Sequence, residues 1–292
     1  MKPAILFYGN CQAGALAVIF GADPIIKASF DVTYAASFDD RTSSKVTLTR
    51  EVVGTTAILF EQHDPKVFPM RALLPPNCLT VTFPSIDLNL LWPLHCANPF
   101  NDTPTAETPW GRFFYGDRII VDCIQRGLSA AETIQIYEHS SAQHLPNLDR
   151  FAALEAARLA SRDLKCTVTM ADFILAHFRE QNLFWTVNHP TMAALRELSS
   201  RLIERAKLRS IVFYSVQLDA TIAGLPPQGP LGELRVPVHP NIANHFKLTW
   251  YPDEASKQYG LRREPLTYRE YFGQMTECAA SVRDCASIGS RT

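Results

Sequence analysis

The stretch AILFYGNCQAGALAVIF, residues 4–20, contains a strand that changes abruptly into a helix. Residues 4–8 form a short apolar run of β-forming side chains, and residues 10–20 have the composition of a helix that Gly21 and Pro24 would end. Asn10 alone would suffice to cap that helix. Cys11 and Gln12 therefore need another explanation, which makes this turn the first candidate site.

Three further apolar runs continue the pattern at intervals of about 20 residues. They are FDVTYA (30–35), TAILFEQ (56–62) and CLTVTFP (78–84). Continuous runs of this kind fit a parallel sheet that is covered on both faces. We predict an α/β fold, with a Rossmann-like parallel sheet in residues 1–90 and a loop-rich, mainly helical half in residues 91–292 packed onto it. No repeat or clear linker separates the halves, so we expect a single compact unit.

Helical signals dominate the second half. Ser129 and Glu132 have the spacing of a capping box, residues 151–164 are rich in Ala and Leu, and residues 169–172 look like another helix start. A further helix is indicated by apolar residues at helical spacing after Pro190, which fits the first helical position. These apolar residues are Met192, Leu195, Leu198 and Leu202. Between the second and third apolar runs lies a polar segment with Ser43, Ser44 and Lys45.

The composition excludes several classes of protein. The chain has 292 residues, 47% of them hydrophobic and 20% charged, and its net charge of -1 argues against a nucleic-acid-binding surface. The seven cysteines include no C-x-x-C pair and fit no zinc module, so we predict reduced thiols in a cytoplasmic protein and no metal. No apolar run is long enough for a signal peptide or a membrane-spanning helix.

The turn after the first strand suits chemistry on an acyl group. Ligands of open α/β sheets bind beyond the carboxyl ends of the strands. Gly9 allows a tight turn, the first N–H groups of the helix favour an anion, and the helix dipole favours a Cys11 thiolate. Asn10 and Gln12 have amide donors for a thioester carbonyl or a phosphate. The turn could therefore hold a nucleophile and an oxyanion site, although a cap, a packed cysteine and a solvated glutamine would also explain it.

The strand-Gly-Asn-Cys-Gln-helix turn and three later stretches resemble the WcbI family of polysaccharide-biosynthesis proteins, which are regarded as acetyltransferases that bind coenzyme A. The stretches are FYGDRIIVDCIQRGLSAAET (114–133), ADFILAHFREQNLFWTVNHPT (171–191) and VHPNIANHFKLTWY (238–251). The chain departs from the family pattern at LWPLHCANP (91–99), where His95 stands without the Pro-Asp that we expect after it.

The resemblance implies an acyltransferase that moves an acetyl group from acetyl-coenzyme A to a sugar hydroxyl in capsular or surface polysaccharide biosynthesis. His189, beside Asn188 and at a predicted helix start, is the candidate base, and Asp117 is a candidate to orient a histidine. A cap or core histidine and an ordinary YGDR turn are the alternatives. The expected catalytic residues are Cys11, His189 and Asp117.

The expected coenzyme A contacts are spread over both halves of the chain. Arg112 and Arg118 match phosphate groups, although solvated loop arginines are the alternative, and Trp110, Phe113 and Tyr115 are candidates to line an adenine or pantetheine slot or to pack in the core. The expected cofactor-binding residues are Gly9, Asn10, Gln12, Arg112, Arg118, Tyr115, Asn188 and His95.

Two other functions stay open at this point. The Gly-Asn-Cys turn is similar to the Gly-Asp-Ser turn of SGNH-type esterases, with Cys11 in place of serine, but the chain contains no Asp-x-x-His segment. A non-catalytic module that binds coenzyme A or a nucleotide would keep the phosphate contacts and tolerate loss of Cys11. The expected partners are an acyl-coenzyme A, a sugar or nucleotide-sugar acceptor, and other polysaccharide-assembly enzymes.

Overall fold

The computed structural model describes residues 2–38, 48–63, 66–102, 104–105, 108–208, 214–253, 255–261 and 264–289. The polar segment around Ser43, Ser44 and Lys45 lies outside these residues. Contacts divide the chain into two compact units. The first unit comprises Met1–Asp87, Ala156–Phe184 and Asn188–Gly232, and the second comprises Leu88–Glu155, Trp185–Val187 and Glu233–Thr292. The expectation that both pack as one unit stays a prediction.

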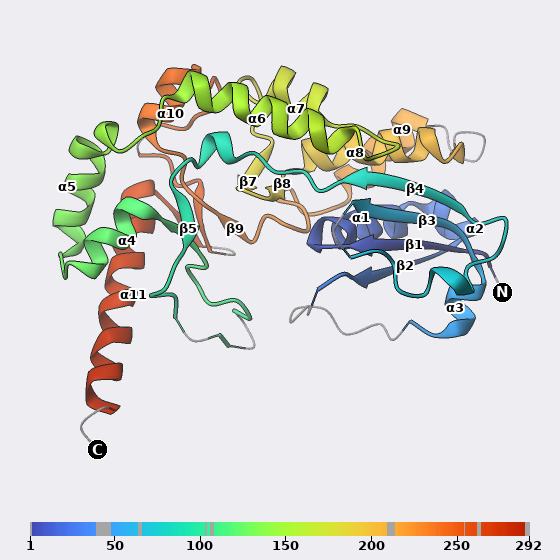
Figure 1. Ribbon diagram of the computed structural model, residues 1–292, viewed down its shortest axis with the longest axis horizontal. Helices are drawn as coiled ribbons and strands as arrows, with labels where there is room; N and C mark the ends of the chain where they lie inside the picture. Colours follow the sequence, from blue (N-terminus) through green and yellow to red (C-terminus); the bar gives the residue numbers. More distant parts are fainter. Residues whose placement is uncertain are drawn as a thin grey trace. The chain divides into compact units, whose positions relative to one another are not determined.

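A four-stranded parallel sheet forms the centre of the first unit (Figure 1). Its strand order is β2-β1-β3-β4, and Phe7 is in register with Tyr34 on one side and Phe60 on the other. The strands are β1 (Ala4–Gly9), β2 (Asp31–Ala36), β3 (Thr56–His63) and β4 (Leu79–Pro84). The predicted Rossmann-like sheet is therefore confirmed, since each strand coincides with one of the four apolar runs.

Apolar side chains cover both faces of this sheet. On one face, Phe7 stacks on Phe60 with ring centroids 4.8 Å apart and meets the edge of Phe20 at 5.0 Å. On the other face, Tyr8 contacts Phe68 at 5.2 Å within a second buried cluster. Because neighbouring residues of β1 face opposite sides and both sides are buried, the strand shows a continuous apolar run instead of alternation.

The helices of the first unit follow the predicted apolar spacing, with one correction. Leu195, Leu198 and Leu202 are buried, as the spacing predicts. Pro190, however, lies in the short strand β8 (His189–Pro190), and the following helix begins at Met192. The helices are α1 (Cys11–Ala22), α2 (Pro24–Ser29), α3 (Arg50–Gly54), α6 (Leu148–Asp163, which begins in the second unit), α7 (Ala171–His177), α8 (Met192–Arg205) and α9 (Tyr214–Ala223).

The residue that caps the start of α7 lies outside residues 169–172, the segment that predicts this helix. The Asp163 carboxylate, at the end of α6, accepts hydrogen bonds from the N–H groups of Met170 (2.9 Å) and Ala171 (2.7 Å). Asp172 instead pairs with Arg201 on α8 at 2.7 Å. The predicted helix start is correct, but a carboxylate from the preceding helix caps it.

The second unit is mainly helical around an apolar cluster that α4, α5 and α11 share. The predicted capping box is present, since Ser129 N–H donates to Glu132 at 2.8 Å and Glu132 N–H donates back to Ser129 Oγ at 3.3 Å. The elements are β5 (His95–Ala97), β6 (Tyr115–Asp117), α4 (Arg118–Gln125), α5 (Ala130–Ser140), β9 (Leu234–Arg235), α10 (Pro240–Phe246), β10 (Tyr259–Leu261), β11 (Glu264–Leu266) and α11 (Tyr268–Gly289). The chain passes between the units in β7 (Phe184–Thr186).

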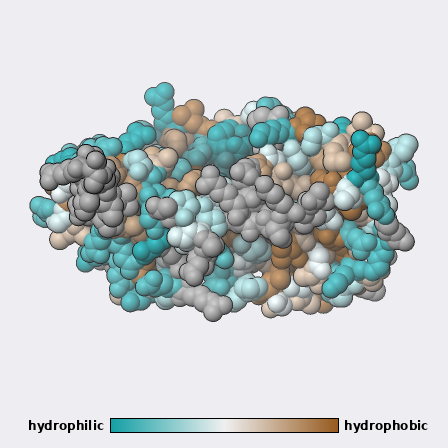
Figure 2. Space-filling view, turned by 90° about the horizontal axis from the view of Figure 1, so that it is seen from below, coloured by the Kyte–Doolittle hydropathy of each residue, from teal (hydrophilic) through white to brown (hydrophobic). Residues whose placement is uncertain are grey.

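Exposed apolar side chains are scattered along the described residues. They include Val67, Leu154, Leu164 and Val216. On the face that Figure 2 draws, hydrophilic and hydrophobic residues are interspersed. In the described part of the chain, every helix is too short or too polar to span a bilayer.

Candidate active site at the carboxyl edge of the sheet

Polar residues from three parallel strands meet at one edge of the sheet. Asn10 follows β1, Gln62 lies near the end of β3, and Ser85 follows β4. Asn10 N–H donates to Gln62 Oε1 at 2.8 Å, and Asn10 Nδ2 donates to Ser85 Oγ at 3.2 Å. The edge where ligands of open α/β sheets bind is therefore held together by a continuous hydrogen-bond network.

Gly9 is required at this edge because the backbone passes very close to Gln62. A Cβ atom on Gly9 would lie 2.5 Å from Gln62 Cβ and 2.6 Å from Gln62 Oε1. Neither atom could yield without moving the carboxamide that accepts from Asn10. Glycine is therefore needed at this position for the internal packing of the turn, and the approach of a ligand is not required to explain it.

Asn10 is the N-cap of α1, as the sequence predicts. Its Oδ1 accepts a hydrogen bond from Gln12 N–H at 2.9 Å. The N–H groups of Ala13 and Gly14 donate to the Asn10 carbonyl at 3.0 and 3.3 Å. Three N–H groups of the first turn are thus already hydrogen-bonded within the turn. The expectation that the first N–H groups of the helix are open to an anion is therefore wrong for these three.

Gln12 is completely buried, and its side chain connects three segments of the first unit. Its Nε2 donates to the carbonyls of Ile86 (2.6 Å) and Asn188 (2.8 Å), and its Oε1 accepts from Ile86 N–H (3.0 Å) and Gln62 Nε2 (3.1 Å). Both amide hydrogens are therefore used. The structure corrects the interpretation of Gln12 as a donor to a ligand and makes it a positioning residue.

Cys11 is the first residue of α1, between the cap and this buried glutamine. It is partly exposed, and its sulfur is a thiol instead of half of a disulfide. The sulfur thus lies at the positive end of the helix dipole. Because the carboxamides on either side of Cys11 are fixed by hydrogen bonds, the backbone that carries the thiol is fixed with them.

His189 belongs to the same unit as Cys11, and Gln12 links the two segments through the Asn188 carbonyl. Its ring is not at a helix start, because Thr191 N–H donates to the Leu183 carbonyl at 2.9 Å and holds the chain extended until Met192. Burial lowers the pKa of His189 to about 4. The imidazole is therefore neutral at pH 7, which is the form that a general base requires.

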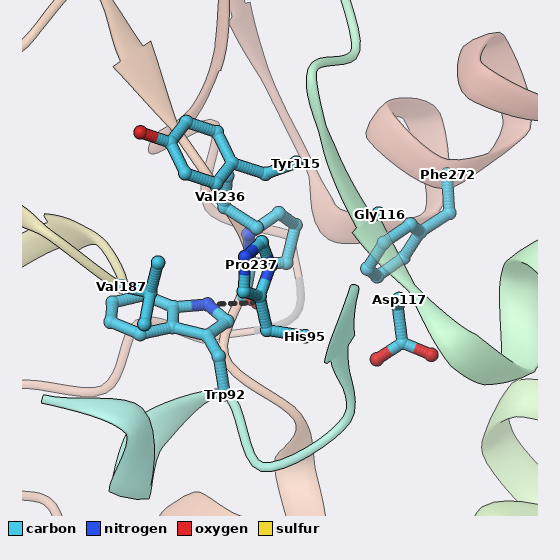
Figure 3. Close-up of a pocket in the computed structure, with 9 residues that line it drawn as sticks. All are labelled: Trp92, His95, Tyr115, Gly116, Asp117, Val187, Val236, Pro237 and Phe272. Atoms are coloured by element: carbon cyan, nitrogen blue, oxygen red, sulfur yellow. Dashed lines mark hydrogen bonds between the residues drawn. The ribbon is translucent and has the colours of Figure 1, made fainter. Parts of the chain in front are cut away.

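His95, Tyr115 and Asp117 lie together in the second unit, where they line a small pocket (Figure 3). His95 faces Asp117 directly across the β5–β6 pair, and its ring lies 5.5 Å from that of Tyr115. Burial lowers the pKa of His95. Trp92 and Phe272 are among the other lining residues, and Trp92 Nε1 donates to the Pro237 carbonyl at 2.9 Å.

Asp117 caps α4. Its Oδ1 accepts from Ile119 N–H at 2.9 Å, and burial raises the pKa of Asp117 to about 6. The YGDR segment is thus a strand end followed by a helix cap. This accounts for the aspartate without assigning it a role in orienting a histidine.

The other expected coenzyme A contacts also belong to the second unit. The Arg112 guanidinium lies 5.3 Å from the ring centre of Phe113, which is itself buried in the apolar cluster. Arg118 is exposed at the start of α4, and the Trp110 ring meets Phe114 at 6.0 Å. Phe113 is thus a core residue, which was one of its two predicted roles.

The sequence interpretation missed Gln62 and Ser85. Both are polar residues at the ends of apolar runs, TAILFEQ and CLTVTFPS, and that position was the available signal. Within the described residues, no group of three or more His, Cys, Asp or Glu side chains is arranged to hold a metal ion.

The sheet and its polar edge define an α/β protein with a candidate site at the carboxyl ends of parallel strands. The family model described as "Polysaccharide biosynthesis enzyme WcbI" matches residues 4–210. This chain therefore belongs to the WcbI family of polysaccharide biosynthesis enzymes. The match includes the first two of the three later stretches that carry the resemblance, and residues 238–251 lie beyond it.

A solved structure of WcbI, described as a novel polysaccharide biosynthesis enzyme, has a similar fold. It is 17% identical, the alignment covers 100% of this chain and 94% of that one, and the TM-score is 0.71. That structure is described as the native protein without a disulfide bond between coenzyme A and a cysteine. Comparison with curated proteins gave no match.

Proposed function

We propose that this chain binds coenzyme A and transfers an acetyl group from acetyl-coenzyme A to a sugar hydroxyl in capsular or surface polysaccharide assembly. The observation that carries the proposal is the Gln12 side chain, which joins the Cys11 turn to the segment of Asn188 and His189 at the carboxyl edge of the sheet. A thiol and a neutral imidazole are thereby held in one unit. The description of the solved relative supports coenzyme A as the ligand.

The chemistry follows from the protonation state of His189. In direct transfer, the neutral imidazole removes the proton of the sugar hydroxyl while its oxygen attacks the thioester carbonyl carbon. The carbon–sulfur bond then breaks, and the coenzyme A thiolate takes the proton back from the imidazolium. We favour this path over acetylation of Cys11, because transfer from one thioester to another thiol gains little free energy.

The remaining expected residues keep proposed roles in binding. Arg112 and Arg118 are proposed to contact the phosphates of coenzyme A, since a guanidinium pairs with phosphate oxygens bidentately. Such contacts are partly exposed and should weaken as salt is added. Localisation in the cytoplasm, where acetyl-coenzyme A is made, belongs to the same proposal.

Calorimetric titration with coenzyme A tests the proposal. We expect saturable binding that weakens between about 50 and 500 mM salt because screening lengths shorten over this range. We also expect acetyl-coenzyme A to release its thiol only when a sugar acceptor is added. Cys78→Ala, a matched cysteine of the first unit, is the control for Cys11→Ala.

The outcomes separate the three functions. No binding at millimolar coenzyme A would overturn the proposal. Rapid thiol release without any acceptor would favour the esterase instead. Binding that is unchanged in Cys11→Ala and His189→Ala, with no transfer in any variant, would favour the non-catalytic module.

A further inference from the structure

Arg235 is a long cationic side chain on the edge strand of the three-stranded sheet of the second unit. The strand order is β11-β10-β9, and β9 ends at Arg235. The residues on either side, Leu234 and Val236, pack against the apolar cluster of the unit. Because successive side chains of an extended segment alternate, Arg235 extends on the opposite face from this cluster.

Within the described residues, nothing pairs with the Arg235 guanidinium. Its Nε atom is enclosed without a hydrogen-bond acceptor, although the residue as a whole is only half-buried. Burial lowers the pKa of Arg235, and no carboxylate opposes that shift. An arginine nevertheless stays charged in a protein, so the fold encloses one donor of a charged group without an acceptor.

The sheet itself has no acceptor for this cation. Gly260 of β10 lies directly opposite Arg235, and Pro265 of β11 lies opposite Gly260. Residues that are directly opposed in antiparallel strands share a face, so the guanidinium shares its row with a glycine and a proline. The backbone also requires that glycine, since a Cβ atom on Gly260 would lie 2.0 Å from the Glu264 carbonyl oxygen.

We propose that Arg235 is the anchor of a binding site for a phosphoryl anion, meaning a phosphomonoester or a pyrophosphate. The planar guanidinium pairs bidentately with such an anion, and the hydrogen bonds that the fold leaves unmade would then be formed. The proposal concerns a residue to which the proposed function assigns no role, and it deepens that function where the phosphoryl group belongs to the acyl donor. It applies equally to coenzyme A and to a nucleotide-activated sugar, which share this chemistry.

Thermal unfolding of Arg235→Met, with and without pyrophosphate at constant ionic strength, tests the proposal. Without the anion, we expect Arg235→Met to unfold at a temperature equal to or above that of the wild type, because the substitution removes an uncompensated charge. Pyrophosphate should raise the unfolding temperature of the wild type and leave that of Arg235→Met unchanged. Arg126→Met, which replaces an exposed and paired arginine at the C-cap of α4, should respond like the wild type.

Calorimetry with pyrophosphate supplies a second test, which holds even if Arg235→Met does not fold. Arg235→Lys keeps the charge but loses the planar fork, so its affinity should fall about tenfold. An undiminished affinity of Arg235→Lys, or a pyrophosphate effect that persists in Arg235→Met, would overturn the proposal. A wild type that responds to acetate and not to pyrophosphate would overturn it as well.

Competition identifies the source of the phosphate. Displacement of pyrophosphate by coenzyme A and not by uridine diphosphate would assign the site to the acyl donor. Displacement by uridine diphosphate and not by coenzyme A would assign it to a nucleotide sugar. Arg235-dependent binding of pyrophosphate by a chain that does not bind coenzyme A would support this site while it contradicts the proposed function.

Discussion

In the proposed function, the chemistry at the carboxyl edge of the sheet depends on the sulfur of Cys11 and the imidazole of His189. The nearby carboxamides of Gln12 and Gln62 are buried and hydrogen-bonded to each other at 3.1 Å. They fix the backbone of the turn, and the two side chains that we propose to act on a substrate are the thiol and the imidazole. A residue-level test must therefore separate the role of the sulfur from that of the base.

Substitution of His189 and Cys11 separates these roles. If His189 is the general base of direct transfer, His189→Ala should lower kcat about 10²–10⁴-fold, and Cys11→Ala should have a much smaller effect. His139→Ala, an exposed histidine on α5, is the control. The measurement is the rate of thiol release from acetyl-coenzyme A with a sugar acceptor. Full turnover by His189→Ala, or an acetylated Cys11 that proceeds to product, would contradict direct transfer.

The same assay has a predicted pH dependence. A base acts in its unprotonated form, and burial holds the pKa of His189 near 4, well below its ordinary value of 6.5. The acid-side loss of kcat/KM should therefore fall near pH 4 instead of pH 6.5. Since the unfolded state would bind a proton to this ring between these two values, the contribution of His189 to stability should also decrease as the pH falls from 6.5 to 4.

At the scale of elements, Gln12 connects the start of α1 with the loop after β4 and with the segment before β8. Gln12→Leu would remove the hydrogen bonds that Gln12 makes with the carbonyl and N–H of Ile86 and with the Asn188 carbonyl. Buried polar groups without partners cost about 1–3 kcal/mol each, so we expect the free energy of unfolding to fall by at least about 2 kcal/mol. Denaturant unfolding measures this change.

Gln181→Leu is the matched control, because Gln181 is exposed on a turn of the same unit. Its effect should stay within about 0.5 kcal/mol. Coenzyme A binding should weaken in Gln12→Leu and not in Gln181→Leu. A Gln12→Leu protein as stable as the wild type would show that this network does not hold the site together.

The elements were predictable where the signal is local. The strands can be recognised in the sequence as apolar runs, because both faces of the sheet are buried. Helix α8 can be recognised from the helical spacing of Leu195, Leu198 and Leu202. The start of α8 was not predictable, because bonds from Thr191 to Leu183 (2.9 Å) and Asn182 (2.8 Å) keep Pro190 extended. Such partners depend on the tertiary fold, and the X-Pro pattern does not encode them.

The candidate site was predictable only in part. The Cys11 turn is a local feature, and its place at a strand end follows from the fold class. The role of Gln12 was not predictable, since its partners are as distant in sequence as Ile86 and Asn188. Likewise, the pairing of His95 with Asp117 comes from two strands of three residues each, which are too short to produce a periodic signal.

At the scale of the whole molecule, the predicted site residues divide between the two units. The first unit contains the Cys11 turn (residues 9–12), Asn188 and His189. The second unit contains the other predicted site residues, which are His95, Arg112, Tyr115, Asp117 and Arg118. A net charge of -1 provides no general attraction for a phosphorylated ligand. The proposed binding of coenzyme A therefore depends on individual groups, and the position of the coenzyme A sulfur tests the proposal most directly.

Mapping the reaction with the symmetrical disulfide of coenzyme A makes this test directly. A thiolate attacks one sulfur of this reagent, forms a mixed disulfide and releases one coenzyme A thiol. We expect mass spectrometry of peptides to find the adduct first on Cys11 among the seven cysteines, and we expect acetyl-coenzyme A to slow its formation. Faster modification of Cys78 or another thiol, or no protection by acetyl-coenzyme A, would contradict a coenzyme A site at the Cys11 turn.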